Sequence, residues 1–303
     1  MIDIVWSEKS LDSDNRSHYA SSTMLNESFD GAFGSDGAVH RNGFEQLPAN
    51  AEGAIVLVHG EHQNGDARAL VDRVARLGWA IVIVFGDEPG SFPARLFMGN
   101  RKVVWVQYPI PGRHDYAQRR FICGYPNEIR IARAMPEMPR DLDWFFSGQI
   151  NHARRVSCVN ELKKLRNGVL KENPSFWFGY PHDEYYQYMK RAKVIPCPSG
   201  GATPDTIRLA EALECGCVPI ADDRYPPFHP RNMAPGMCGY WEFVLRERPP
   251  FPILNDWRHL PQIMDDVLRN WDKYRAVLGP WWEKYKSSYG AWLKEDLRIV
   301  GAA

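Results

Sequence analysis

Two unbroken apolar stretches constrain the fold more than any other feature of this sequence. Residues 53–58 (GAIVLV) and 79–85 (WAIVIVF) carry no charged or hydroxyl side chain, which is typical of strands that are buried on both faces. Between them, apolar residues recur at helical spacing from Leu70 to Leu77. A buried strand, a helix and a second buried strand predict a parallel sheet with right-handed crossovers.

The same alternation of elements predicts two α/β halves along the chain. In the first half, further strands are expected at residues 2–6, 102–107 and 120–123, and residues 7–50 are expected to form loops around a short helix. Residues 124–140 are rich in proline and arginine and predict a linker. In the second half, strands are expected at 144–146, 175–179, 193–197 and 218–221, and helices at 160–167, 183–191 and 203–215, before an aromatic-rich terminal segment that Pro280 interrupts.

Composition excludes several classes of protein. Lys+Arg and Asp+Glu both number 37, so the formal net charge is zero, which argues against a generally basic nucleic-acid binder. No apolar run reaches the roughly 18 residues that span a bilayer, and the N-terminus does not resemble a signal peptide. We therefore expect a cytoplasmic protein with no membrane span. The six cysteines form no CxxC pair, so reduced thiols are expected and a metal site is not.

The most informative segment is residues 193–223. A strand enters a Pro-Ser-Gly-Gly-Ala turn, Thr203 is placed as an N-cap, Pro204 suits the first helical position, and a second strand follows the helix. Such a helix start offers unpaired N–H groups and the positive end of a dipole to an anion. Gly200 and Gly201 would let the backbone approach that anion closely.

Two charged residues lie three positions apart on this otherwise apolar helix. Arg208 and Glu211 share one face, and a helix so apolar is expected to be buried. One interpretation is a surface salt bridge between the two. The other places them in a cleft, where Arg208 meets a phosphate and Glu211 accepts hydrogen bonds from vicinal hydroxyls, as on a ribose.

Here the sequence resembles a known family. The patterns C-P-x-G at 197–200, T-x-R-x-x-E-A at 206–212 and G-C-V-P-I at 216–220 resemble the donor-site signature of exostosin-type glycosyltransferases. Weaker similarities flank this core, and the resemblance as a whole covers roughly residues 140–290. The flanking similarities are F-F-S-G at 145–148, R-R at 154–155, P-F at 227–228 and N-D-W-x-x-L at 255–260.

The resemblance implies two Rossmann-like domains facing a cleft (the GT-B architecture) and a nucleotide-diphosphate sugar as co-substrate, with a UDP-sugar favoured and no other cofactor. It implies an N-terminal acceptor domain over residues 1–135 and a donor-binding domain over residues 141–275. A C-terminal helix over residues 276–303 is then expected to pack back on the first domain. The acceptor stays open between a glycan, a small molecule and modified DNA.

Carried over by position, the resemblance also assigns residues. The donor-binding residues would be Gly148, Arg155, Gly200, Gly201, Thr203, Thr206, Arg208 and Glu211, and Tyr180 and His182 would lie near the nucleobase. Many retaining relatives of this fold have a second Glu eight residues before Glu211, where this chain has Thr203. That departure favours an inverting reaction. The fold that the resemblance implies requires no metal, so the expected reaction is a metal-independent hexosyl or pentosyl transfer.

An inverting transfer needs a general base for the acceptor hydroxyl. The base is expected at the carboxyl edge of the first sheet, and one of Asp87, Glu88 and His59 is favoured. The other candidates are Glu61, His114, Asp115, His18 and Asp14.

Three other functions remain open at this stage. V-L-V-H-G at 56–60 looks like the opening of an α/β-hydrolase, although the nearest match to its nucleophile elbow, around Ser199, lacks the first glycine. The same transfer could act on hydroxymethylated bases of phage-type DNA, with the arginine-rich segments 113–120 and 130–140 on the phosphates. A non-catalytic nucleotide binder is the third.

Overall fold

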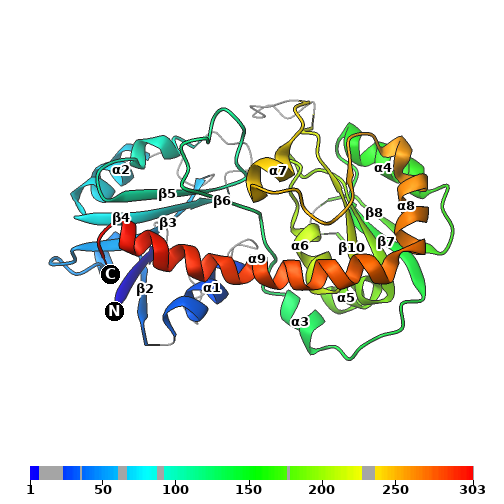
Figure 1. Cartoon of the computed structure of the whole chain (residues 1–303), viewed down its shortest axis with the longest axis horizontal. Helices are drawn as coiled ribbons and strands as arrows, with labels where there is room; N and C mark the ends of the chain where they lie inside the picture. The colour runs from blue at the N-terminus through cyan, green and yellow to red at the C-terminus, as the bar shows by residue number, and fades with distance from the viewer. Residues whose placement is uncertain are drawn as a thin grey trace. The chain divides into compact units, whose positions relative to one another are not determined.

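The chain forms two compact units, each built on a parallel β-sheet (Figure 1). The computed structural model describes residues 1–6, 23–34, 36–60, 67–86, 92–175, 178–226 and 236–302. The first unit joins Met1–Cys123 to Lys284–Ala303, and the second is Gly124–Glu283.

The first sheet has its strands in the order β2-β1-β3-β4-β5-β6, and every strand pairing that the structure describes is parallel. Because β1 lies between β2 and β3, the chain reverses its direction of travel across the sheet there. The strands are β1 (Ile2–Trp6), β2 (Ala38–Asn42), β3 (Gly53–His59), β4 (Trp79–Phe85), β5 (Lys102–Gln107) and β6 (Arg119–Phe121).

Helices cover both faces of this sheet (Figure 1). On one face, Leu70 and Val74 of α2 (Ala67–Arg76) join Val56 and Val82 in a buried cluster. On the other lie α1 (Thr23–Phe33) and the end of the long helix α9 (Trp271–Ile299). There the indole of Trp105 donates a hydrogen bond of 2.7 Å to the Asp296 carboxylate of α9. Two short 3₁₀ helices, Phe44–Gln46 and Ala94–Phe97, complete the described elements of the unit.

The second sheet repeats this topology with strand order β11-β10-β9-β7-β8, again with parallel pairings. The direction in which successive strands are added across this sheet reverses between β7 and β9. The strands are β7 (Leu142–Gln149), β8 (Gly168–Asn173), β9 (Ala192–Cys197), β10 (Val218–Asp222) and β11 (Ile253–Leu254).

Right-handed crossovers place α4 (Ala153–Leu162) on one face of this sheet, and α5 (His182–Arg191) and α6 (Ile207–Glu214) on the other. The packing agrees, because α4 contacts α8 (Leu260–Arg269) and the 3₁₀ turn Trp257–His259, whereas α3 (Ile129–Ala134) contacts α5 and α6. A further helix, α7 (Tyr240–Leu245), follows β10 along the chain.

The predicted fold class is confirmed: both units are α/β and Rossmann-like, on two parallel sheets. That they face a cleft stays a prediction. Strands 53–58 and 79–85 were well placed because they are fully buried and therefore continuously apolar, and strand 102–107 was recognised from its buried apolar centre, residues 103–106.

Several element predictions were wrong. The strand after α4 is Gly168–Asn173, which was missed because an edge strand with exposed polar residues lacks the apolar signal. Of the strand predicted at 175–179, residues 176 and 177 lie outside the described residues, and the other three are not in a strand. The helix predicted at 160–167 is Ala153–Leu162. The predicted linker contains α3, whose Ile129 is buried, and β2 was not foreseen. Pro280 does not interrupt the terminal helix, which runs through it.

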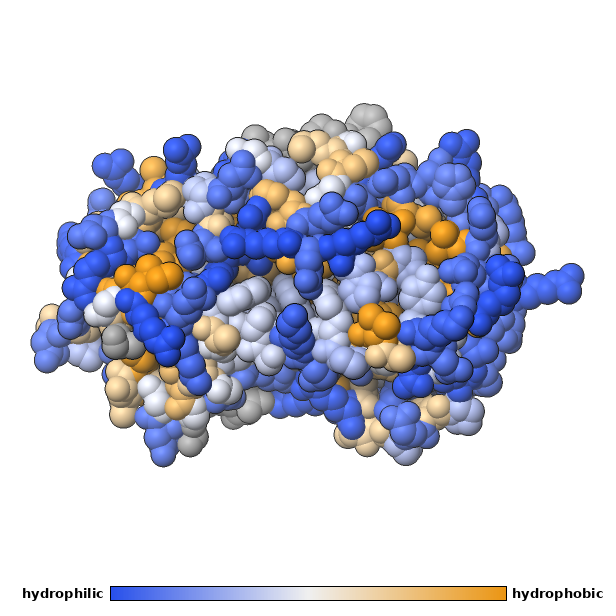
Figure 2. Space-filling model, viewed as in Figure 1, coloured by the Kyte–Doolittle hydropathy of each residue, from blue (hydrophilic) through white to orange (hydrophobic). Residues whose placement is uncertain are grey.

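The surface in Figure 2 is mostly hydrophilic, with apolar residues in small separate groups. Large hydrophobic side chains that are exposed include Leu96, Met98 and Phe178. Among the helices that the structure describes, none combines the length and apolar character needed to cross a bilayer.

Candidate functional site

The predicted anion-binding segment lies at the point where the second sheet reverses direction. β7 and β9 are neighbours, with Trp144 opposite Val194, and their carboxyl ends lead into the loops that begin α4 and α6. Ligands of open α/β sheets bind in the crevice outside such a switch point. The topology therefore brings two segments of the sequence, around Gly148 and Gly200, to one expected ligand site.

Arg208 is the central side chain of this site. It lies in the first turn of α6, only 9% exposed, with its guanidinium 4.6 Å from the Phe146 ring centre. Its Nη2 donates a hydrogen bond of 2.6 Å to the carbonyl oxygen of Ser147. Among the described residues, nothing accepts a hydrogen bond from its buried Nε and Nη1. Burying a cation whose donor atoms lack acceptors costs free energy unless an anion accepts their hydrogen bonds.

Gly148 makes room for this guanidinium. A Cβ atom at residue 148 would lie 2.5 Å from the Nη2 of Arg208, closer than non-bonded atoms tolerate. The sequence assigned Gly148 to direct contact with phosphates. The structure gives it a contact with the arginine itself, so a glycine is required here for Arg208 to keep its position.

Two threonines lie at the start of α6. Thr206 is in the N-cap position, yet its hydroxyl makes no capping hydrogen bond, and Thr203 is completely buried. Neither hydroxyl oxygen has a partner among the described residues. Thr203 was wrongly predicted as the N-cap, because the chain stays non-helical through Thr206 while the Asp205 carboxylate accepts a hydrogen bond from Tyr240.

The first turn of α4 ties the two switch-point loops together. Arg155 donates to the carbonyl oxygens of Ser199 (3.0 Å) and Gln149 (3.3 Å), so it bridges the loop after β9 and the carboxyl end of β7. The Nε2 atom of His152 lies 3.2 Å from the same Ser199 oxygen. Burial lowers the pKa of His152 to about 4, so its ring is neutral at physiological pH. Arg155 thus positions the glycine loop, whatever it contributes to a bound ligand.

Asp222, which the sequence analysis missed, anchors the same loop from the end of β10. It is fully buried, and the Nε and Nη2 atoms of Arg154 donate hydrogen bonds to its two carboxylate oxygens. It also accepts hydrogen bonds from the Ser199 hydroxyl (2.8 Å) and the Trp257 indole (3.0 Å). The available signal was the pair of acids that ends an apolar strand at its carboxyl edge.

Glu211 lies one turn after Arg208 and is 4% exposed. Its two carboxylate oxygens accept hydrogen bonds from Tyr185 (2.9 Å) and Tyr186 (2.8 Å) of α5. Burial raises its pKa, while the two hydroxyls and then the Arg208 charge act in the opposite direction. The interpretation of Arg208 and Glu211 as a surface salt bridge is wrong, because both side chains are buried and Arg208 donates a hydrogen bond to the backbone carbonyl of Ser147.

No protein-family model matches this chain. The rice (Oryza sativa subsp. japonica) protein named probable glucuronosyltransferase GUT1 is 35% identical to it over 109 residues, which cover 34% of this chain and 26% of the rice protein. Two more rice proteins, each named a probable glucuronosyltransferase, are 34% identical over 110 residues with the same coverage. The chain therefore matches about a quarter of the length of these curated relatives.

The two residues assigned to the nucleobase lie at the start of α5. Tyr180 packs against Tyr188 with ring centres 4.9 Å apart, and the Lys171 ammonium lies 5.2 Å from the Tyr180 ring centre. His182 is exposed in the first turn of α5. Tyr180 precedes α5 and His182 is its first residue, and the same helix carries the two tyrosines that contact Glu211.

Of the three favoured bases, only His59 lies within the described residues; Asp87 and Glu88 fall outside them, as do Glu61, His18 and Asp14. His59 ends β3, next to the switch point of the first sheet, and packs edge-on against Phe85. Gly86 admits this ring, because a Cβ atom there would collide with it.

Two further candidates for the base have structural contacts instead. His114 is buried, its Nδ1 accepts a hydrogen bond from the Ile110 backbone, and burial lowers its pKa to about 4. Asp115 accepts a hydrogen bond of 3.0 Å from the Gly112 N–H within the same turn. Both therefore stabilise this loop.

The geometry does not favour the two competing enzymatic interpretations. The Ser199 hydroxyl is buried against Asp222, and its described contacts include no histidine nitrogen, unlike a hydrolase nucleophile. In the arginine-rich segments, Arg119 binds Asp296 and Glu295, Arg133 binds Glu214, and Arg140 binds backbone carbonyls. These arginines bind groups of the protein itself, which does not favour a role on the phosphates of DNA.

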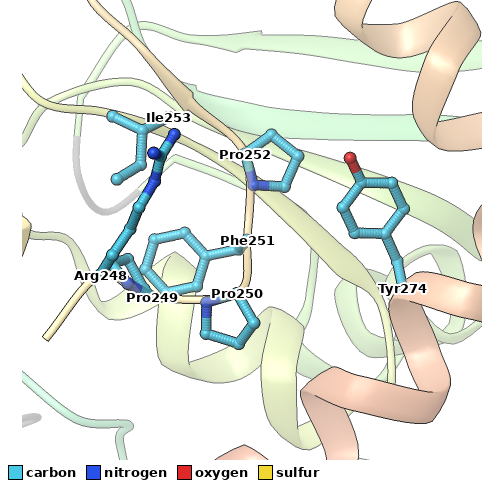
Figure 3. Close-up of a pocket in the computed structure, with 7 residues that line it drawn as sticks. All are labelled: Arg248, Pro249, Pro250, Phe251, Pro252, Ile253 and Tyr274. Atoms are coloured by element: carbon cyan, nitrogen blue, oxygen red, sulfur yellow. The ribbon is translucent and has the colours of Figure 1, made fainter.

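A separate pocket of about 240 Å³ lies elsewhere in the second unit (Figure 3). It is lined by Arg248, Pro249, Pro250, Phe251, Pro252, Ile253 and Tyr274. None of the donor-site residues lines it. No group of three or more His, Cys, Asp or Glu side chains that could hold a metal occurs within the described residues.

Proposed function

We propose that this chain is a glycosyltransferase that takes its sugar from a nucleotide-diphosphate sugar, with a UDP-sugar favoured. The observation that carries the proposal is the buried guanidinium of Arg208, at a helix start beside a topological switch point, whose Nε and Nη1 atoms have no acceptor among the residues that the structure describes. A diphosphate fits this setting because pairs of its oxygens can accept two parallel N–H bonds of a guanidinium, and because it brings negative charge to a helix N-terminus.

In this proposal Glu211 binds the ribose of the donor. Arg208 and Glu211 are separated by one helical turn, so a ligand that places its diphosphate on the first would bring its ribose toward the second. The names of the rice relatives support a sugar transferase rather than another nucleotide-dependent activity.

In the proposed reaction, an acceptor hydroxyl oxygen attacks the anomeric carbon and its proton passes to a general base. The bond from that carbon to the diphosphate breaks, and the nucleoside diphosphate leaves with the electron pair. Arg208 and the N-terminus of α6 stabilise the charge that develops on the leaving group. His59, Asp87 and Glu88 are the candidates for this base, and no metal is needed in this proposal.

The test is turnover with a panel of UDP-, GDP- and ADP-sugars, read as release of the nucleoside diphosphate and as transfer to hydroxyl acceptors. We expect one nucleotide to be preferred and Arg208→Ala to lose about 10- to 100-fold in activity, the value of one or two hydrogen bonds to a charged group. Arg269→Ala is the matched control, because Arg269 is an exposed arginine in an ion pair on α8. Failure of every nucleotide sugar to bind or react would overturn the proposal.

A further inference from the structure

The tyrosine pair on Glu211 has a geometry that a purely structural contact does not require. Tyr185 and Tyr186 are consecutive on α5, and each donates to a different oxygen of the carboxylate, at 2.9 Å to Oε2 and 2.8 Å to Oε1. Tyr186 is completely buried and Tyr185 is half-buried. Two hydroxyls on two oxygens fix both the position and the rotation of the carboxylate plane.

The number of acceptor sites then decides what else Glu211 can bind. An ionised carboxylate has about four lone-pair sites, of which the two tyrosines occupy one on each oxygen. One site remains on each oxygen, and the two are held in a fixed relation. A vicinal diol, with two adjacent hydroxyl donors, is the ligand chemistry that matches such a pair.

We propose that Tyr185 and Tyr186 are positioning residues that hold the Glu211 carboxylate ready to accept hydrogen bonds from the two ribose hydroxyls of the donor. This inference rests on the proposed function. It gives Tyr185 and Tyr186 of α5 a role in holding Glu211 that the sequence did not predict.

The charges around Glu211 explain why two hydroxyls are needed. Burial disfavours the ionised carboxylate, and the hydrogen bonds from Tyr186 and Tyr185 oppose that effect. Arg208 on the same helix and His182 on α5 also favour the ionised form. Cys197 at the end of β9 and Cys215 after α6 are the other titratable groups that interact with it. Removing a tyrosine hydroxyl therefore raises the pKa of Glu211 further.

The sign of the resulting pH effect follows directly. A protonated Glu211 loses acceptor sites for the diol, so nucleotide affinity falls as the pH drops through the pKa of Glu211. Loss of a hydrogen bond to a charged group is worth about one pKa unit or more. In Tyr185→Phe, the pH at which nucleotide affinity is lost should therefore rise by about one pH unit. Tyr186→Phe should behave in the same way.

The experiment measures the dissociation constant of UDP from pH 5 to pH 8, with GDP and ADP as further probes. Tyr274→Phe is the matched control, because Tyr274 also donates to a carboxylate, Asp266, at 3.2 Å, outside the site. We expect the control to follow the wild type and Tyr185→Phe to weaken binding about tenfold more at low pH than at pH 8. In Glu211→Gln the loss of UDP affinity at low pH should disappear. The double variant Glu211→Gln/Tyr185→Phe should not regain that pH dependence.

Different results would overturn the positioning role of the tyrosines and the proposed function. If a nucleotide binds the wild type and the curves of Tyr185→Phe and Tyr274→Phe coincide, the positioning role is overturned and the proposed function stands. If none of the three nucleotides binds the wild type, the proposed function fails and this inference fails with it.

Discussion

Replacing Gly148 by alanine should disable the anion site without removing any charged group. The added Cβ would lie 2.5 Å from the Nη2 of Arg208. Because non-bonded heavy atoms settle at roughly 3.5 Å or more, the guanidinium must move by about 1 Å. That displacement breaks its 2.6 Å hydrogen bond to Ser147. A misplaced charged hydrogen bond costs about 1.5–3 kcal/mol, so nucleotide affinity should fall about 10- to 100-fold.

The assay is calorimetric titration of Gly148→Ala with UDP, beside Gly279→Ala as the matched control. Gly279 lies within α9, where an added Cβ meets nothing within 4 Å, so that variant should bind like the wild type and fold at least as stably. A Gly148→Ala protein that is folded and binds UDP with unchanged affinity would refute the argument that Gly148 admits Arg208 to the site.

Three further predictions concern the stability and reactivity of the chain. Asp222→Asn should lower the free energy of unfolding by about 3–5 kcal/mol in urea titrations, since it breaks a buried ion pair with Arg154; a loss under about 1 kcal/mol would contradict this. Stability should fall as the pH drops from 6.5 toward 4, because the folded chain keeps His114 neutral while the unfolded chain protonates it. His114→Asn should reduce this loss of stability at low pH. If the urea midpoint of unfolding depends on pH in the same way in His114→Asn as in the wild type, the prediction is wrong. In the folded protein, a thiol reagent should modify Cys238 rapidly and the other five cysteines slowly, because only Cys238 is exposed; mass spectrometry of the labelled peptides would reveal any other order.

The sequence alone predicted the fold class because buried parallel strands have a strong local signal. The runs at 53–58 and 79–85 are apolar at every position, and the structure buries every residue of both strands. By contrast, β8 lies at a sheet edge with half-exposed and exposed residues. Its local pattern does not differ from that of a loop, and the apolar SFWFG segment after it was taken for the strand instead.

The candidate site was predicted in its residue types and only partly in its contacts. Arg208 and Glu211 were recognised because charged residues on an apolar helix need a reason to be there. Their partners could not be predicted, because the contacts of Ser147 with Arg208 and of Tyr186 with Glu211 join residues 61 and 25 positions apart. Such contacts depend on the strand order β9-β7 and on the packing of α5 against α6, which no local pattern encodes.

The same limit applies to the glycine loop. The P-S-G-G sequence indicated a turn, but the residues that fix it come from α4 and from the end of β10. Asp222 is the clearest example. In the sequence it is one of two adjacent acids, whereas in the fold it holds Arg154, Ser199 and Trp257 together.

The measurement that tests the central claim most directly is thermal stabilisation of the chain by UDP, GDP, ADP and CMP. It should be made on the wild type, on Arg208→Ala and on the control Arg269→Ala. A nucleotide at 100 times its dissociation constant stabilises a protein by about 2.7 kcal/mol, which a melting curve detects easily. The account predicts that one nucleoside diphosphate, UDP first, stabilises the wild type and the control but not Arg208→Ala. Absence of stabilisation by all four, or equal stabilisation of Arg208→Ala, would contradict it.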